Sequence, residues 1–177
     1  RTGDTVVVVG LGSIGCLLAQ GFRLAGTRVL GADLLPARRR LAATLGVEVF
    51  EEDAALDAAL REATGGRGAD VVMLTAGGAA AVAAAAARAR DGGHVHCFAG
   101  GARATLPVAL DTLYHRELTL GATYSSSPTE LTEAFAHLAS GRVIVDGLIT
   151  HRLPLARLEE GVALMRRQEA VKVYVTP

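Results

Sequence analysis

The segment Val6–Gly15 constrains the fold more than any other part of the chain. It begins with four consecutive valines, and an unbroken run of β-branched residues is typical of a strand buried on both faces. Gly10, Gly12 and Gly15 follow with the spacing G-x-G-x-x-G, where the chain turns into a predicted helix. Asp33 lies about 20 residues further on, at the end of a second apolar run. A strand, three glycines, a helix and an acid in this order predict a dinucleotide-binding site.

Each part of this motif has a physical role. Gly10 permits a tight turn, Gly12 lets the backbone approach a pyrophosphate because it has no Cβ, and Gly15 lets the helix pack on the strand. The helix is expected to begin near Ser13 and Ile14. Its first N–H groups are unpaired and carry a partial positive charge, so they suit a diphosphate.

The acid predicts which dinucleotide is bound. A carboxylate at Asp33 can accept hydrogen bonds from both ribose hydroxyls of an adenosine, and it would repel a 2′-phosphate. The motif therefore favours NAD over NADP. The alternative interpretation is a glycine turn in an α/β sheet that binds no ligand.

Composition limits the class of protein. The chain has 177 residues, 50% hydrophobic and 20% charged, which suits one ordered domain with a real core. Its formal net charge is zero, so no nucleic-acid or membrane-surface partner is expected. No apolar run reaches transmembrane length and no signal peptide is expected at the start. Cys16 and Cys97 are the only cysteines and form no C-x-x-C pair, which predicts a reducing, cytoplasmic setting.

Strand and helix patterns alternate along the chain. They predict a doubly wound, six-stranded parallel sheet with helices on both faces, a three-layer Rossmann arrangement. A pair of glycines, Gly92 and Gly93, is expected to end the fourth helix. The expected strands are 6–9, 28–32, 47–50, 70–74, 94–98 and 118–124, and the expected helices are 14–25, 36–45, 53–63 and 79–90.

The rest of the chain has a different pattern. Ser127 and Glu130 form a capping box for a helix that runs to about Ser140. An extended segment at 148–155, a helix at 156–167 and a strand at 171–175 then predict a strand–helix–strand extension. We therefore divide the chain into a dinucleotide-binding domain, residues 1–147, and a C-terminal segment, residues 148–177.

Other candidate site residues follow the later strands. Loops at the carboxyl edge of such a sheet line the ligand cleft, so these residues are expected to lie near the nicotinamide half of the cofactor. The alternative is that they form simple turns. They are Thr75, Ala76, Phe98, Ala99, Gly100, Thr123 and Tyr124.

The histidines and cysteines do not predict a metal site. His94 and His96 would share one face of a strand, but we interpret them as core residues. Zinc needs three or four converging ligands, which Cys16 and Cys97 do not supply.

Several segments resemble one known family, the zinc-type medium-chain alcohol and polyol dehydrogenases. The chain is similar to their coenzyme-binding half over essentially its whole length, and the C-terminal segment is the more specific part. The resemblance implies that Arg38 lies against the adenine ring. The segments that carry it are 3–10, 33–38, 124–128, 148–155 and 172–177.

The resemblance also implies what this chain lacks. The family's GroES-like catalytic barrel, with its zinc ligands and proton relay, is absent, so no catalytic residue is assigned and the chain alone is expected to be inactive. Residues 148–177 would pack against that barrel. Two coenzyme domains would join at the sheet edge as a homodimer, with residues 143–145 and 148–149 resembling a further edge strand.

Two other functions compete with this interpretation. A zinc-free quinone or enoyl reductase would use NADPH, which the acid at Asp33 disfavours. A nucleotide-sensing regulatory module would share the glycine motif and the acid, but residues 148–177 argue against it. The leading interpretation is the NAD-binding domain of a zinc-type alcohol or polyol dehydrogenase, which holds the cofactor for hydride transfer.

Overall fold

A computed structural model describes residues 1–99 and 105–177. In this part of the chain six parallel strands form one sheet in the order β3-β2-β1-β4-β5-β6. This order is the doubly wound arrangement of two three-strand halves, as predicted. The strands are β1 (Thr5–Val9), β2 (Arg28–Ala32), β3 (Glu48–Phe50), β4 (Ala69–Leu74), β5 (Ala89–Cys97) and β6 (Thr119–Ala122).

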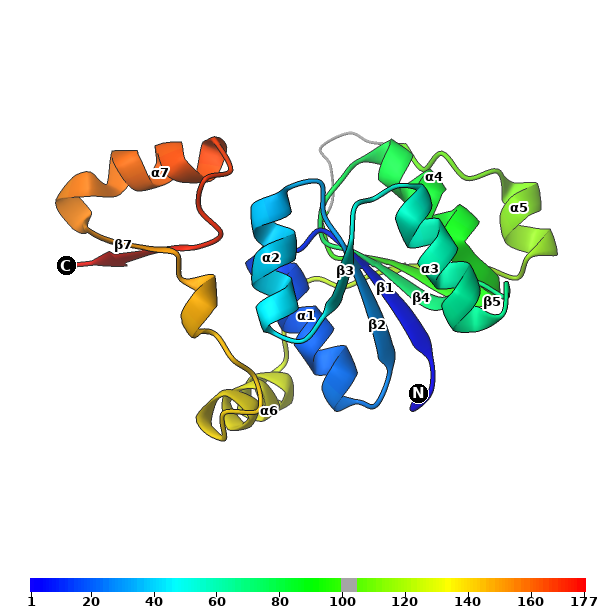
Figure 1. The fold of residues 1–177 in the computed structure, drawn as a ribbon, viewed down its shortest axis with the longest axis horizontal. Helices are drawn as coiled ribbons and strands as arrows, with labels where there is room; N and C mark the ends of the chain where they lie inside the picture. The colour runs from blue at the N-terminus through cyan, green and yellow to red at the C-terminus, as the bar shows by residue number, and fades with distance from the viewer. Residues whose placement is uncertain (100–104) are drawn as a thin grey trace.

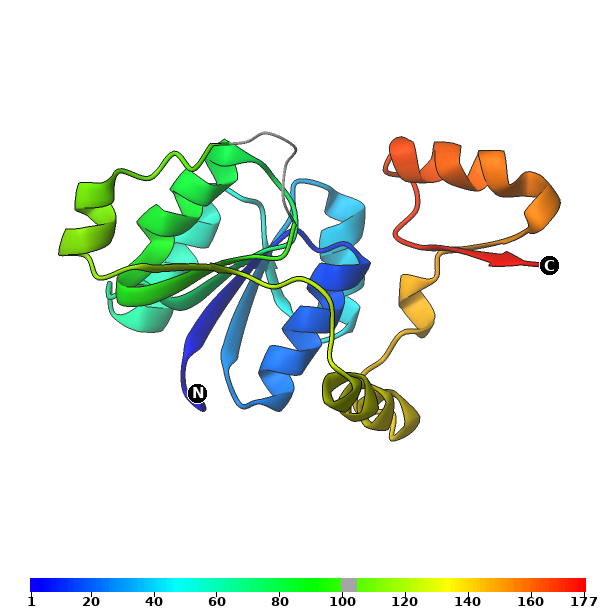
Figure 2. The same ribbon diagram turned by 180° about the vertical axis from the view of Figure 1, so that it is seen from behind.

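Helices cover both faces of the sheet (Figures 1 and 2). Val6 and Val8 of β1 belong to the core on the side of α1 and α2, while Val7 and Val9 belong to the core on the side of α3 and α4. Successive side chains of a strand point to opposite faces, so an unbroken valine run fills both cores. These helices are α1 (Ser13–Leu24), α2 (Pro36–Thr44), α3 (Ala54–Thr64) and α4 (Ala79–Arg88).

Local capping signals place two helix starts where the sequence predicts them. The Asp53 carboxylate accepts a hydrogen bond from the Ala55 N–H at 2.8 Å and caps α3. Ser127 and Glu130 form the expected capping box before α6 (Pro128–Ala139).

A buried carboxylate ties β1 to the strand beside it. Asp70, in β4, accepts the Thr5 N–H of β1 at 2.8 Å. It also pairs with Arg67 at 2.7 Å and with Arg90 at 2.6 Å. The hydrogen bonds from Arg67, followed by those from Arg90 and Thr5, hold the pKa of Asp70 well below its usual range despite burial, which opposes this shift. The carboxylate is therefore charged at neutral pH and stabilises the sheet.

The boundary between α4 and β5 differs from the prediction. The helix ends at Arg88, and β5 begins at Ala89 and contains Gly92 and Gly93. A Cβ on Gly93 would lie 2.7 Å from the Arg90 carbonyl oxygen, so this glycine permits a close backbone approach and does not end a helix. A short helix, α5 (Leu110–His115), was also not predicted.

The C-terminal part forms the predicted strand–helix–strand unit. Its two strands pair in parallel as a separate small sheet. Figures 1 and 2 both show this unit beside α2, far from α4 and α5. The elements are η1 (Asp146–Leu148), β7 (His151–Pro154), η2 (Leu155–Arg157), α7 (Leu158–Arg166) and β8 (Val173–Thr176).

The expected edge strand over residues 143–145 and 148–149 is wrong. The side-chain amide of Gln20, in α1, donates to the Ile144 carbonyl at 3.0 Å and accepts the Ile144 N–H at 2.8 Å. Leu148 is buried with the core under α1 and α2. The segment is thus fixed against α1, because one side chain takes the hydrogen bonds that a neighbouring strand would make.

Over residues 1–99 and 105–177, no helix has the length and apolar character needed to cross a membrane.

Candidate functional site

Two glycines of the motif are required by the fold itself. Gly10 has a φ of +91°, and a Cβ there would lie 2.7 Å from the Thr75 hydroxyl oxygen. A Cβ on Gly15 would overlap the carbonyl oxygen of Gly10. The turn after β1 can therefore pack on α1 and β4 only with glycine at these positions.

Gly12 has no such structural requirement. Its φ of −69° is ordinary for any residue. A Cβ at Gly12 would meet nothing within 4 Å. The space in front of α1 is therefore open at the position where the motif needs the backbone to approach a pyrophosphate.

Free hydrogen-bond donors face this open space. Gly12 is the N-cap of α1, and no side chain caps the helix. Within the described chain, no residue accepts a hydrogen bond from the N–H groups of Gly12, Ser13, Ile14 or Gly15. Four unpaired donors at the positive end of a helix dipole are an arrangement that suits an anion.

Asp33 lies at the carboxyl end of β2 and has a structural role as well. Its side chain is 6% exposed. One carboxylate oxygen accepts the Leu11 N–H at 2.7 Å, and the other accepts the Leu35 N–H at 2.8 Å. Each oxygen can accept a further hydrogen bond, so the carboxylate keeps capacity for ribose hydroxyls while it fixes both loops.

Arg38 approaches the same carboxylate. Its Nη1 is 3.6 Å from Asp33 Oδ2. The Nε of Arg38 is buried and has no hydrogen-bond partner among the described residues. A buried donor without a partner is costly, so this atom remains available to an acceptor on a ligand.

Asp33 and Arg38 line one cavity of about 220 Å³ together with Gly10 of the glycine turn and Ala76 from the loop after β4, all of which the sequence predicts. The other predicted residues of the turn, Gly12, Ser13, Ile14 and Gly15, do not line it. The cavity also contains Glu52 and Gln168, which sequence reasoning missed. Gln168 follows α7 with a φ of +60°, and neither residue belongs to a motif that would have drawn attention to it.

The other predicted residues do not line the Asp33 cavity, with the exception of Ala76. The Thr75 hydroxyl donates to the Gly10 carbonyl at 2.7 Å, so it supports the turn. Ala76 also lines a second cavity of about 180 Å³ together with Ala99. Phe98 is 44% exposed, and Gly100 lies outside the described residues.

The two residues after β6 do not line the Asp33 cavity. The Thr123 hydroxyl oxygen is 3.1 Å from His96 Nε2. The Tyr124 side chain is fully exposed.

The thiols and imidazoles form no metal centre in the described residues. No group of three or more His, Cys, Asp or Glu residues there is placed to hold a metal ion. Burial, reinforced by the charge of Asp33, raises the pKa of the Cys16 thiol to about 11. This thiol therefore stays protonated and unreactive at neutral pH.

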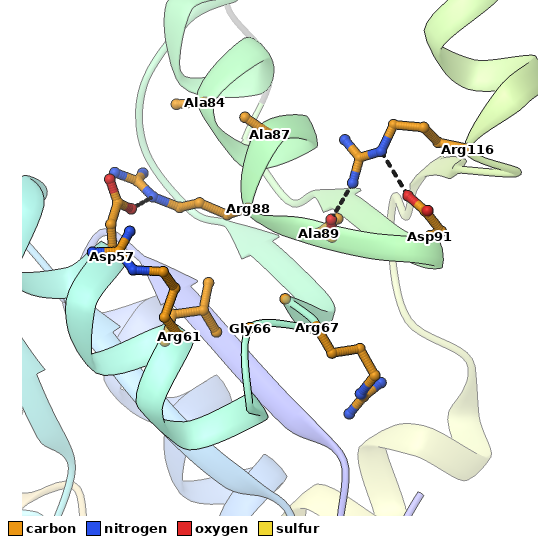
Figure 3. Close-up of a pocket in the computed structure, with 12 residues that line it drawn as sticks. Asp57, Arg61, Gly66, Arg67, Ala84, Ala87, Arg88, Ala89, Asp91 and Arg116 are labelled. Carbon is orange, nitrogen blue, oxygen red and sulfur yellow. Dashed lines mark hydrogen bonds and ion pairs between the residues drawn. The ribbon is translucent and has the colours of Figure 1, made fainter.

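A larger cavity of about 590 Å³ lies between α3 and α4, near the amino end of β4 (Figure 3). Arg67, Arg88 and Arg116 are engaged within the fold, whereas Arg61 makes no ion pair or side-chain hydrogen bond among the described residues. Arg88 pairs with Asp57 at 2.7 Å, and Arg116 pairs with Asp91 at 2.8 Å and donates to the Ala86 carbonyl at 2.7 Å. We interpret this cluster as ion pairs and carbonyl caps that join neighbouring elements.

Comparisons with known proteins agree with this geometry. The profile of a family described as zinc-binding dehydrogenase matches residues 3–140. A probable zinc-binding alcohol dehydrogenase of Mycobacterium tuberculosis is 34% identical over 165 residues, which cover 93% of this chain and 42% of that protein. L-galactonate-5-dehydrogenase of Escherichia coli is 30% identical over 178 residues, covering 98% and 52%.

A solved structure shows the same architecture. An alcohol dehydrogenase from a Thermus species superimposes with a TM-score of 0.87 at 31% identity, covering 99% of this chain and 52% of that one. The chain thus spans about half the length of the relatives that it matches.

Proposed function

The chain belongs to the zinc-binding dehydrogenase family, and from this premise we propose that it binds NAD as the coenzyme domain of an alcohol or polyol dehydrogenase. The observation that carries this proposal is the open space at Gly12, faced by the free N–H groups of Gly12–Gly15. A glycine that the fold does not need, at the start of an uncapped helix, fits a diphosphate ligand.

Different residues of the described chain would bind the different parts of the cofactor. The first turn of α1 would bind the diphosphate through its N–H groups, and Asp33 would accept hydrogen bonds from the adenosine ribose. The planar guanidinium of Arg38, which lines the same cavity, suits the face of the adenine ring. Bound NAD supplies a nicotinamide ring that accepts or donates a hydride. Thr75, Ala76, Phe98 and Ala99 stay our candidates for the residues beside that ring.

We propose that hydride transfer takes place in a longer enzyme. Relatives are about twice the length of this chain, and the residues described here supply no zinc site. A catalytic barrel with a zinc ion would lower the pKa of the alcohol that is oxidised. The match to alcohol and polyol dehydrogenases favours this function over the zinc-free reductase and the regulatory module.

The C-terminal segment is the proposed contact surface for that barrel. Leu158, Val162 and Met165 of α7 are all more than 40% exposed, although they form the apolar face of the helix. They line an apolar hollow of about 410 Å³ together with Val173 and Val175. We keep the division at residue 148 as part of the proposal, because this unit has its own small sheet.

Two further properties complete the proposal. Two copies would join as a homodimer at the β6 edge of the sheet. β6 pairs with β5, and no further strand of the described chain lies on its other side. Phe135 of α6, which follows β6 in the chain, is 71% exposed. A cytoplasmic location fits Cys16 and Cys97, which are both free thiols.

Calorimetric titration of the purified chain with NAD tests the central claim. We expect one binding site per chain, with competition by ADP-ribose, which carries the adenosine and diphosphate groups without nicotinamide. A chain that is folded by circular dichroism but shows no heat of binding at millimolar NAD would refute the proposal.

A further inference from the structure

A second carboxylate, that of Glu52, lines the cavity that contains Asp33. Glu52 follows the end of β3, and β3 pairs with β2, the strand that leads into Asp33. The two acids therefore come from adjacent strand ends. The glycine and acid motif does not include Glu52, although this residue lines the same cavity.

Asp33 alone is a weak barrier to a 2′-phosphate in this cavity. Arg38 Nη1 lies 3.6 Å from its Oδ2, so the two charges nearly cancel. An arginine near this position is also the type of side chain that accommodates a 2′-phosphate. Another negative charge is needed if the cavity is to reject the phosphorylated cofactor.

The negative charge of Glu52 is not fully neutralised by Arg88, with which it forms an ion pair. Arg88 Nη1 is 3.3 Å from Glu52 Oε1, and Arg88 Nε is 2.7 Å from Asp57 Oδ1. Figure 3 shows the Arg88 side chain directed at Asp57. One guanidinium thus serves two carboxylates, and the three groups together keep one net negative charge.

Solvent screens this charge only partly. The Glu52 side chain is 21% exposed, and that of Arg88 is 11% exposed. Charges that are partly buried are screened by salt and water much less than exposed ones. Arg88 also restricts the movement of the Glu52 carboxylate, so its charge stays beside the cavity.

We propose that Glu52 is a second specificity-determining residue, which selects the cofactor without a 2′-phosphate by placing a fixed negative charge in the Asp33 cavity. This inference rests on the proposed NAD-binding function. A 2′-phosphate carries up to two negative charges at neutral pH and is repelled, whereas a ribose 2′-hydroxyl is neutral.

The neighbouring Glu51 offers a matched control. It is the same residue type, pairs with Arg39 at 3.4 Å, is 55% exposed and does not line the cavity. The purified chain and its Glu52→Gln and Glu51→Gln variants would be titrated with AMP and with adenosine 2′,5′-bisphosphate. These probes differ only in the 2′-phosphate and report on the adenosine end of the site.

Glu52→Gln should raise the affinity for the bisphosphate relative to AMP by about three- to ten-fold, the size expected when one charge near a doubly charged phosphate is removed from a water-filled cavity. Glu51→Gln should leave this ratio unchanged. An unchanged ratio in Glu52→Gln, or equal changes in both variants, would overturn the inference.

The unmodified chain provides a second measurement that does not depend on how a variant folds. Raising the ionic strength screens repulsion, so the preference for AMP over the bisphosphate should shrink. A preference that grows with salt would mean net attraction of the 2′-phosphate and would overturn the inference. Failure to bind either NAD or AMP would instead refute the proposed function, whereas NAD binding with an unaltered ratio refutes only the role of Glu52.

Discussion

Replacing Gly12 with valine should separate ligand binding from folding at this site. The φ of −69° suits any residue, and a Cβ there contacts nothing within 4 Å. Valine is a poorer N-cap than glycine by about 1 kcal/mol, but it also restricts the unfolded chain by about 0.4–1 kcal/mol. These effects oppose each other, so the free energy of unfolding should change by less than about 1 kcal/mol.

The affinity for NAD should change far more than the stability in Gly12→Val. The branched side chain would fill the open space in front of α1, where the diphosphate must approach the free N–H groups of Gly12–Gly15. A hydrogen bond to a charged group is worth about 1.5–3 kcal/mol, so losing two of them costs at least about 3 kcal/mol. Affinity for NAD should therefore fall by more than about 100-fold.

Gly15→Ala is the matched control, because its Cβ would overlap the Gly10 carbonyl oxygen. It should lower the free energy of unfolding by several times the change in Gly12→Val. Urea unfolding followed by circular dichroism, with calorimetric titration of the folded variants, measures both quantities. Our reasoning is refuted if Gly12→Val unfolds the chain, or if it binds NAD as tightly as the unmodified protein.

Four further predictions concern other parts of the molecule. Asp33→Ala should weaken NAD binding about ten- to a hundred-fold. It should also lower the free energy of unfolding by about 1–3 kcal/mol, because the buried Leu11 N–H and the partly buried Leu35 N–H lose their acceptor. A variant of unchanged stability in urea would contradict this structural role. Asp70→Asn should destabilise the chain by about 1.5–3 kcal/mol at pH 7, because it weakens hydrogen bonds that involve a charged group. Folding lowers the pKa of Asp70, so the contribution of its charge to the free energy of unfolding is complete above about pH 4 and declines as the pH falls below that value. The difference in the free energy of unfolding between the unmodified chain and Asp70→Asn should therefore be smaller at about pH 3 than at pH 7. The purified chain should contain no stoichiometric zinc by elemental analysis and form no NADH from alcohols, and detection of either would mean that a site has been overlooked. Sedimentation should show a dimer that Phe135→Asp converts to a monomer, whereas a monomeric unmodified chain would exclude the proposed interface.

The sheet could be predicted because its signals are local. The valine run, the helix caps and the alternation of strand and helix patterns each act within a few residues, and the structure confirms the doubly wound order. The boundary between α4 and β5 could not be predicted in this way. Gly93 looks like a helix stop, but its role depends on contact with the Ala69 carbonyl of the neighbouring strand.

Long-range contacts explain the other differences. Residues 143–145 have the composition of a strand, yet the Gln20 side chain, far away in the sequence, takes the hydrogen bonds of Ile144. In the candidate site, too, contacts between residues far apart in the sequence could not be predicted. Its glycines and Asp33 follow from the motif, whereas Glu52 and Gln168 enter the cavity only because the fold brings a strand end and the C-terminal segment together.

The two loops anchored on Asp33 have a consequence for redesign. The acid at the end of β2 is the first residue to consider when the cofactor preference of such a domain is redesigned, because it contacts the adenosine ribose in this type of site. Here its replacement also removes the acceptors of Leu11 and Leu35, so the turn that carries the glycine motif would loosen along with the selectivity. A successful library would keep Asp33 and vary the residues around it, or would supply new acceptors for both N–H groups in the same step. Asp33 thus holds the local backbone in place, so a new cofactor preference is expected to evolve through changes at neighbouring residues while Asp33 is kept.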